Sequence, residues 1–203
     1  MELTPAEKRY AVLGIALIAA SVNPLSLMLA QELEVARFSF DMLLVWGAGL
    51  IGVYLSRLMY EKGGTLSRAV LSLNYKTKGV LYSWGIAGAL LTLWYLPNFF
   101  DLSVVSLQYR AAQIVTFLVA GVIGGIGWDA LGKAMKSFTL FSMFSMMAAV
   151  AEIFLEMAGY YSVNYYPAYP TDQLVETSYM LFAMAAVPST YYMVKVLKDL
   201  DLF

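Results

Sequence analysis

Two glutamates lie within an apolar stretch of the chain, where ionisable side chains are most often functional. Glu152 and Glu156 are four residues apart, so they share one face of a helix. A carboxylate at membrane depth is costly and usually faces the bundle interior or a polar cavity. Glu152 is a candidate for proton handling, cation binding or a hydrogen bond to another subunit. Glu156 is close enough to the end of its stretch for interfacial water to solvate it.

Two further polar residues stand at the start of other apolar stretches. Asp41 precedes one of them and Gln113 begins another. Asp41 is expected to cap a helix by accepting backbone N–H bonds. The alternative is that Asp41, Gln113 and Glu152 converge on a polar cavity. Together with Glu156, these residues form the candidate intramembrane polar site.

The residue types that the sequence lacks exclude several kinds of site. It has no cysteine and no histidine, which removes disulfides, thiolate metal sites and the usual haem, copper and zinc ligands. No serine stands beside a plausible base, so no catalytic group is predicted. The 12 methionines are better explained as core filling than as soft metal ligands. We therefore expect neither an enzyme nor a metal site.

The composition is that of an integral membrane protein. Of 203 residues, 61% are hydrophobic and 13% are charged, whereas soluble domains are about half apolar and a quarter charged. Net charge is −1, so nucleic acid is not an expected partner. A bilayer-crossing helix needs about 20 apolar residues. We predict an all-α, single-domain bundle over 1–203 with six such helices, at residues 10–29, 42–60, 79–99, 113–128, 138–160 and 179–196.

The basic residues predict the orientation of this bundle. With six spans, all but two of the 13 Lys and Arg residues fall on one side, and the exceptions are Arg37 and Arg110. Positive charge marks the cytoplasmic side. Both termini are therefore expected in the cytoplasm, with the chain crossing the cell membrane several times.

Small residues indicate how the helices pack. Ala48–Gly52 parallels Ala120–Gly124, which suggests a duplication that aligns Asp41 with Gln113. Gly121 and Gly125 form a G-x-x-x-G face that permits close helix approach, and Gly49 and Gly52 are expected to pack similarly. Asn23-Pro24 predicts a kink, with Asn23 bonding a carbonyl that the proline frees.

The stretch 94–128 combines Trp94, Pro97, Phe100 and Asp101 with a later Phe117, Ala120 and Gly121. This pattern resembles CtaG-like cytochrome c oxidase assembly proteins and a related group of uncharacterised archaeal membrane proteins. The resemblance implies a helical bundle associated with respiratory oxidases. Tyr95, Tyr109, Ile114 and Met42 stand where the family pattern has histidines. A scaffold without those ligands is expected to be an accessory subunit.

Two functions follow as hypotheses. The first is a non-catalytic accessory subunit or assembly factor of a membrane respiratory complex, with the lipid bilayer and larger membrane subunits as partners. The second is a small proton-linked transporter that uses Glu152. No cofactor is expected under either. A bound lipid or quinone fits both, in a pocket lined by the aromatic residues Trp94, Tyr95, Phe99 and Phe100.

Overall fold

The fold is described from a computed structural model that covers residues 5–161 and 164–199. Every regular element in this part of the chain is helical. The chain forms two compact units, Met1–Gly132 and Lys133–Phe203, and each is described by itself. The expectation of one domain over 1–203 stays a prediction.

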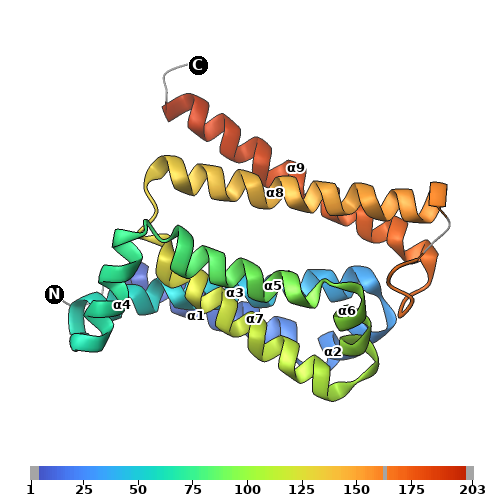
Figure 1. Cartoon of the computed structure of the whole chain (residues 1–203), viewed down its shortest axis with the longest axis horizontal. Helices are drawn as coiled ribbons and strands as arrows, with labels where there is room; N and C mark the ends of the chain where they lie inside the picture. Colours follow the sequence, from blue (N-terminus) through green and yellow to red (C-terminus); the bar gives the residue numbers. More distant parts are fainter. Residues whose placement is uncertain (1–4, 162–163, 200–203) are drawn as a thin grey trace. The chain divides into compact units, whose positions relative to one another are not determined.

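The first unit contains seven α-helices and one π-helical turn within its described residues (Figure 1). The short helices α2 and α6 lie at one end of this unit, and α4 lies at the other. The long helices α3 and α7 pack against each other along its centre. The elements are α1 (Pro5–Val22), α2 (Pro24–Glu32), α3 (Glu34–Lys62), α4 (Thr65–Lys76), the π-turn η1 (Val80–Gly85), α5 (Ile86–Trp94), α6 (Pro97–Val105) and α7 (Leu107–Trp128).

The kink expected at Asn23-Pro24 is confirmed. The axes of α1 and α2 differ by 52° at this point. The Asn23 side chain donates to the carbonyls of Ala19 and Ala20, at 3.2 and 2.8 Å. Its Oδ1 accepts the backbone N–H of Ser26 at 3.0 Å. Asn23 thus supplies hydrogen-bond partners for carbonyls at the end of α1 and for an N–H at the beginning of α2. These bonds lower the free-energy cost of the bend.

The same succession of elements occurs twice in the first unit. Both α2 and α6 have nine residues and begin with proline, and Pro24 and Pro97 stand 73 positions apart. One extended residue follows each helix. Leu33 has φ −126° and ψ 118°, and Ser106 has φ −124° and ψ 121°. A long helix then starts in each copy, so the first unit contains a structural duplication.

The register of this duplication differs by one residue from the alignment expected from the sequence. The backbone N–H of Arg37 bonds to Leu33, and that of Arg110 bonds to Ser106. Arg37 therefore corresponds to Arg110, and Asp41 corresponds to Ile114 instead of Gln113. The sequence alignment relied on small and aliphatic residues, which recur in many membrane helices. The prolines and the extended linkers are the features that fix the register.

Glycines allow the backbones of α3 and α7 to touch. A Cβ atom at Gly52 would overlap the carbonyl oxygen of Val122, and one at Gly125 would overlap that of Gly49. Gly121 is equally tight, because an added Cβ would lie 2.6 Å from the carbonyl oxygen of Val45. The contacts of Gly52 and Gly125 are reciprocal, as expected for an approximate two-fold relation between the copies. Gly49 itself has room for a Cβ, which would be 3.7 Å from the nearest atom.

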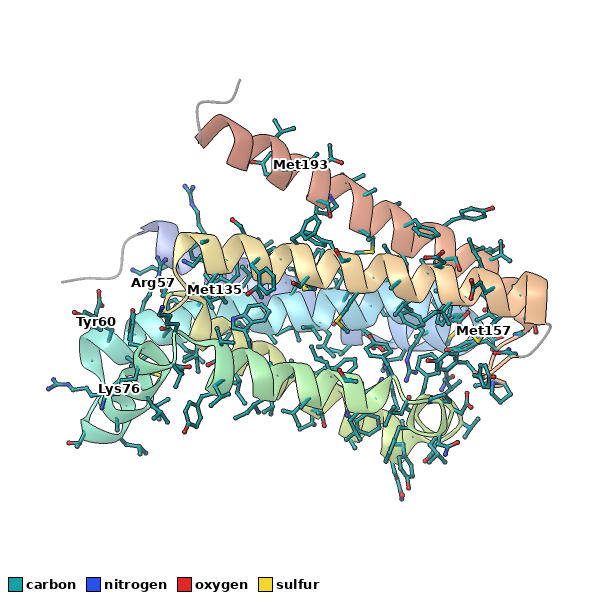
Figure 2. All side chains as sticks on the ribbon, turned by 45° about the horizontal axis from the view of Figure 1, so that its top comes forward. Arg57, Tyr60, Lys76, Met135, Met157 and Met193 are labelled. Atoms are coloured by element: carbon teal, nitrogen blue, oxygen red, sulfur yellow. The ribbon has the colours of Figure 1, made fainter. Side chains whose placement is uncertain are left out.

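The second unit contains α8 (Lys133–Glu156), the π-turn η2 (Met157–Tyr161) and α9 (Thr171–Asp199). Helices α8 and α9 pack against each other. Met135 and Met157 lie near opposite ends of the segment formed by α8 and η2 (Figure 2). The loop before α9 is fixed by Asn164, which donates to the carbonyl of Tyr169 at 2.8 Å. The Phe154 and Tyr166 rings meet edge to face at 5.5 Å.

Several helices in the described residues are long and apolar enough to cross a membrane. Three qualify alone, at Glu34–Lys62, Leu107–Trp128 and Ala134–Gly159, and two bent pairs raise the number to five if each counts as one span. The expected span 179–196 lies in α9, which is not among them. Helices α3 and α7 begin at Glu34 and Leu107, before the expected span starts at 42 and 113, which stay predictions. The charged residues Arg37 and Arg110 near these helix starts are both paired with Asp41.

We expect Gly125→Ala to destabilise the first unit, with Gly124→Ala as its matched control. The Cβ at residue 125 would overlap a carbonyl of α3, whereas at residue 124 it would make an ordinary contact of 3.7 Å with Ala87. Overpacking typically costs about 1–3 kcal/mol. Alanine is otherwise favoured over glycine within helices by about 1 kcal/mol. Thermal unfolding in mild detergent should show a lower midpoint for Gly125→Ala only. Equal midpoints for the two variants would contradict the close packing of α3 on α7.

Candidate functional site

A buried polar network joins α3, α6 and α7 in the first unit. The Asp41 carboxylate pairs with Arg37 Nε at 3.3 Å and with Arg110 Nη1 at 2.8 Å. Arg110 Nη1 also donates to Gln113 Oε1 at 2.8 Å. Arg37 Nη2 donates to the same Gln113 oxygen and to the Ser103 hydroxyl. All five residues are at most 7% exposed. We call them the arginine network.

The helices place these residues by simple spacing. Arg37 and Asp41 are four apart on α3, and Arg110 and Gln113 are three apart on α7, so each pair shares a helix face. Because α3 and α7 are parallel and in close contact, the two faces meet. The bend between α5 and α6, which is 66°, directs α6 so that Ser103 reaches Arg37.

Pairing makes these buried charges tolerable. Removing an ion from water costs several kcal/mol unless a well-placed partner compensates. Two guanidinium groups share one carboxylate here, and Gln113 Oε1 accepts from both arginines. Glu34 is also fully buried, one turn before Arg37 on α3. Gln113 Nε2 is a buried donor without a hydrogen-bond partner among the described residues.

An aromatic cluster supports the arginine network. The Arg37 guanidinium lies 5.7 Å from the centre of the Phe100 ring. Tyr95 stacks on Phe38 at 5.4 Å and contacts Phe117 at 5.9 Å and Phe100 at 6.4 Å. Rigid rings of this kind restrict the rotamers of the arginine and favour its charge through their π faces.

A pocket of about 230 Å³ lies beside the arginine network. Arg37 and Arg110 contribute to its lining, whereas Asp41 does not. The other lining residues are Leu27, Gln31, Ser103, Val104, Leu107, Ala111 and Ile114. The pocket therefore combines guanidinium donors with predominantly aliphatic walls.

The chain matches one protein family over residues 12–199, which is nearly its whole length. It belongs to the DUF1404 family. That family is described as proteins of unknown function. No curated protein and no solved structure matches the chain.

The candidate residues named from the sequence are only partly brought together in this DUF1404 protein. Asp41 and Gln113 both bond to Arg110. The capping role expected for Asp41 is wrong, because α3 begins at Glu34 and Asp41 lies about two turns inside it. Glu152 and Glu156 are exposed on α8 in the second unit, and a site that they share with Asp41 stays a prediction. The described residues contain no group of acidic side chains that could hold a metal ion.

The residues that carry the family resemblance lie in helix contacts or at helix starts of the first unit. Trp94 is buried in a core cluster with Leu44 and Phe117. Pro97 begins α6, and Asp101 is half-buried one turn later on that helix. Gly121 lies in the contact between α3 and α7.

Sequence reasoning missed the two arginines as site residues. Arg37 and Arg110 were counted as charges of the outer connections, yet they are the centre of the network. One signal was present in the sequence: Arg37 and Asp41 stand four apart, directly before an apolar stretch. Ser103 gave no signal, since its position depends on the bend before α6.

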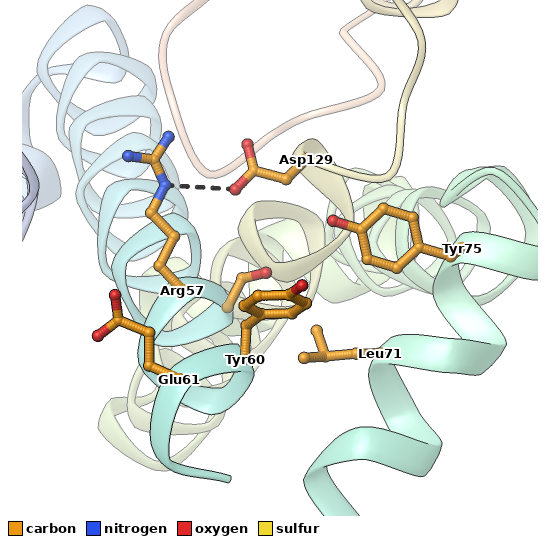
Figure 3. A pocket seen from close by; sticks show the side chains of 7 residues that line it. Arg57, Tyr60, Glu61, Leu71, Tyr75 and Asp129 are labelled. Carbon is orange, nitrogen blue, oxygen red and sulfur yellow. Dashed lines mark hydrogen bonds and ion pairs between the residues drawn. The ribbon is translucent and has the colours of Figure 1, made fainter. Parts of the chain in front are cut away.

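A second pocket, of about 300 Å³, lies near α4 at the other end of the first unit (Figure 3). Arg57 pairs with Asp129 there at 3.3 Å, and both side chains are partly exposed. The Arg57 guanidinium also lies 5.5 Å from the Tyr10 ring centre. Solvated ion pairs contribute little stability. The remaining lining residues are Ser56, Tyr60, Glu61, Leu71 and Tyr75.

We expect Asp41→Asn to destabilise the protein strongly, because two buried guanidinium groups would lose their shared carboxylate. Breaking a buried ion pair typically costs about 3–5 kcal/mol. Glu61→Gln is the matched control, since it makes the same charge change at an exposed position of the same helix. Thermal unfolding in detergent measures both variants. A midpoint for Asp41→Asn that equals that of Glu61→Gln would show that the network adds no stability.

Proposed function

We propose that this protein is a non-catalytic accessory subunit or assembly factor of a membrane respiratory complex of the terminal oxidase type. The observation that carries the proposal concerns the residues of the resemblance to oxidase assembly proteins. Trp94, Phe117 and Gly121 are all buried packing residues of the first unit. The positions that this chain shares with the resembled family thus stabilise the helical scaffold. An accessory subunit needs that scaffold but no metal ligands.

The positions where the resembled family has histidines have other roles here. Tyr95 stacks on Phe38 and contacts Phe117 at a tilt, and Ile114 lines the pocket beside the arginine network. At these two positions, Tyr95 and Ile114 make packing contacts where the resembled family has metal-binding histidines. This supports a scaffold that supplies shape and surface to a complex.

A rigid interior also favours a structural role. The arginine network and the glycine contacts both fix α3 against α7. Apolar side chains are nevertheless exposed beside the network, including Val105 at 74% and Leu107 at 80%. Lipid or an apolar partner subunit suits such a surface.

The proposal includes six membrane spans in the cell membrane, with both termini in the cytoplasm. Support comes from the α4 end of the first unit, where Arg57, Tyr60 and Lys76 lie (Figure 2). Helix α4 follows the Gly63-Gly64 break and exposes Leu66 and Leu73. A basic segment of this kind suits the anionic headgroups of the cytoplasmic leaflet. Arg37 and Arg110, the two cations expected on the outer side, are buried and paired.

We expect the tagged native protein to co-purify with larger membrane subunits. Mild-detergent purification, mass spectrometry and a visible absorption spectrum test this together. Haem-containing subunits at a fixed ratio are the expected result, and a tagged membrane protein of similar size from the same cells is the control. A single colourless species would overturn the stable-subunit form of the proposal.

A second candidate function is a small proton-linked transporter. Its support is the buried Asp41 carboxylate, which pairs with both arginines beside the pocket. Glu152 on α8 is the carboxylate that the sequence favours for the same role. Proton-coupled uptake into vesicles that is lost in Glu152→Gln would favour the transporter over the accessory subunit.

A further inference from the structure

The pocket beside the arginine network lies between corresponding parts of the two copies in the first unit. Gln31 of α2 and Val104 of α6 both line it, and they are 73 positions apart, as are Arg37 and Arg110. The pocket therefore lies where the two copies of the duplication meet. Helices α2 and α6, which contribute to its lining, lie at the end of the unit opposite α4 (Figure 1).

Arg110 has donor capacity that the protein does not use. Both of its bonds, to Asp41 and to Gln113, come from Nη1. Its Nε and Nη2 have no hydrogen-bond partner among the described residues, and the side chain retains 8% exposure. A guanidinium presents five N–H donors in a planar fork that matches phosphate or carboxylate oxygens.

The rest of the pocket suits a ligand with an apolar part. Leu107, Ala111 and Ile114 follow one face of α7 at spacings of four and three residues, and they line the pocket together with Leu27 and Val104. Leu107 is 80% exposed, so the pocket opens beside a lipid-compatible surface. Its volume of about 230 Å³ accommodates a headgroup, and attached chains must continue outward along the exposed face.

The acidic groups of the region do not line this pocket. The Asp41 side chain is fully buried, and Glu34 is buried too. Neither belongs to the pocket lining. The Ser103 hydroxyl does line it, but it donates to the carbonyl of Phe100 at 2.7 Å. A ligand in the pocket thus meets guanidinium and amide donors, backed by a carboxylate that it does not touch.

We infer that this pocket binds the phosphate group of an anionic phospholipid, with the free edge of Arg110 as its principal contact. Two guanidinium groups and an exposed amide at Gln31 face the phosphate, and the aliphatic face of α7 lies along the acyl chains. Charge-assisted bonds to a phosphate are about twice as strong as neutral ones. The inference is independent of any partner complex, because the isolated protein suffices to test it.

The test measures lipid binding to the purified full-length protein after delipidation in detergent. Phosphatidylglycerol, phosphatidylcholine and inorganic phosphate are added separately, and ligand-dependent thermal unfolding and native mass spectrometry report binding. We expect phosphatidylglycerol to bind at least about tenfold more tightly than phosphatidylcholine. Inorganic phosphate should bind more weakly still, because it lacks the acyl chains.

Variants of adjacent alanines localise the binding. Ala111→Trp fills the pocket without replacing any residue of the arginine network and should weaken phosphatidylglycerol binding by about tenfold or more. Ala112→Trp is the matched control, since Ala112 is exposed on α7 but does not line the pocket. Arg110→Lys keeps a charge for Asp41 but loses the planar fork, and it should weaken binding as well.

Three results would overturn the inference. Equal affinity for phosphatidylglycerol and phosphatidylcholine would remove the role of the anionic head. Equal protection by inorganic phosphate would assign the pocket to a free anion. Unchanged phosphatidylglycerol binding in Ala111→Trp would place the lipid elsewhere on the protein.

Discussion

The shared carboxylate of Asp41 is the interaction on which the first unit depends. It pairs with guanidinium groups from both copies of the duplication, and buried charges without such a partner are too costly to keep. The pairing requires α3 and α7 to be parallel, in contact and in one register. The glycine contacts supply the close approach, and the bend before α6 supplies a hydroxyl for Arg37. Electrostatics and backbone packing thus select the same arrangement of helices.

The two copies of the duplication differ in sequence at the arginine network and the pocket beside it. The arginines correspond between copies, but Asp41 corresponds to Ile114, so one carboxylate serves both. Val104 likewise corresponds to Gln31. Both arginines contribute to the lining of one pocket, which combines these polar side chains with aliphatic ones.

Sequence reasoning reached the helical class and the kink at Asn23, because hydropathy and proline act locally. It missed the arginine network, since the partners of Arg37 come from α6 and α7 and depend on tertiary packing. It did not show that the helix containing the expected span 42–60 is continuous from Glu34, because sequence does not reveal whether the polar residues before an apolar stretch have paired charges. The register of the duplication was ambiguous for a related reason, as small residues recur too often to fix an alignment.

The broken helices have a consequence for the surrounding bilayer. The segment Val80–Trp94 comes before the 66° bend and extends only about 22 Å at 1.5 Å per residue. Helix α3 has 29 residues and extends about 43 Å by the same measure. A hydrocarbon layer of about 30 Å matches neither length, so in the proposed membrane arrangement lipid beside α5 would thin while α3 would tilt or project. In that arrangement, headgroups on the side of α2 and α6 would lie deeper than they do in an undisturbed bilayer.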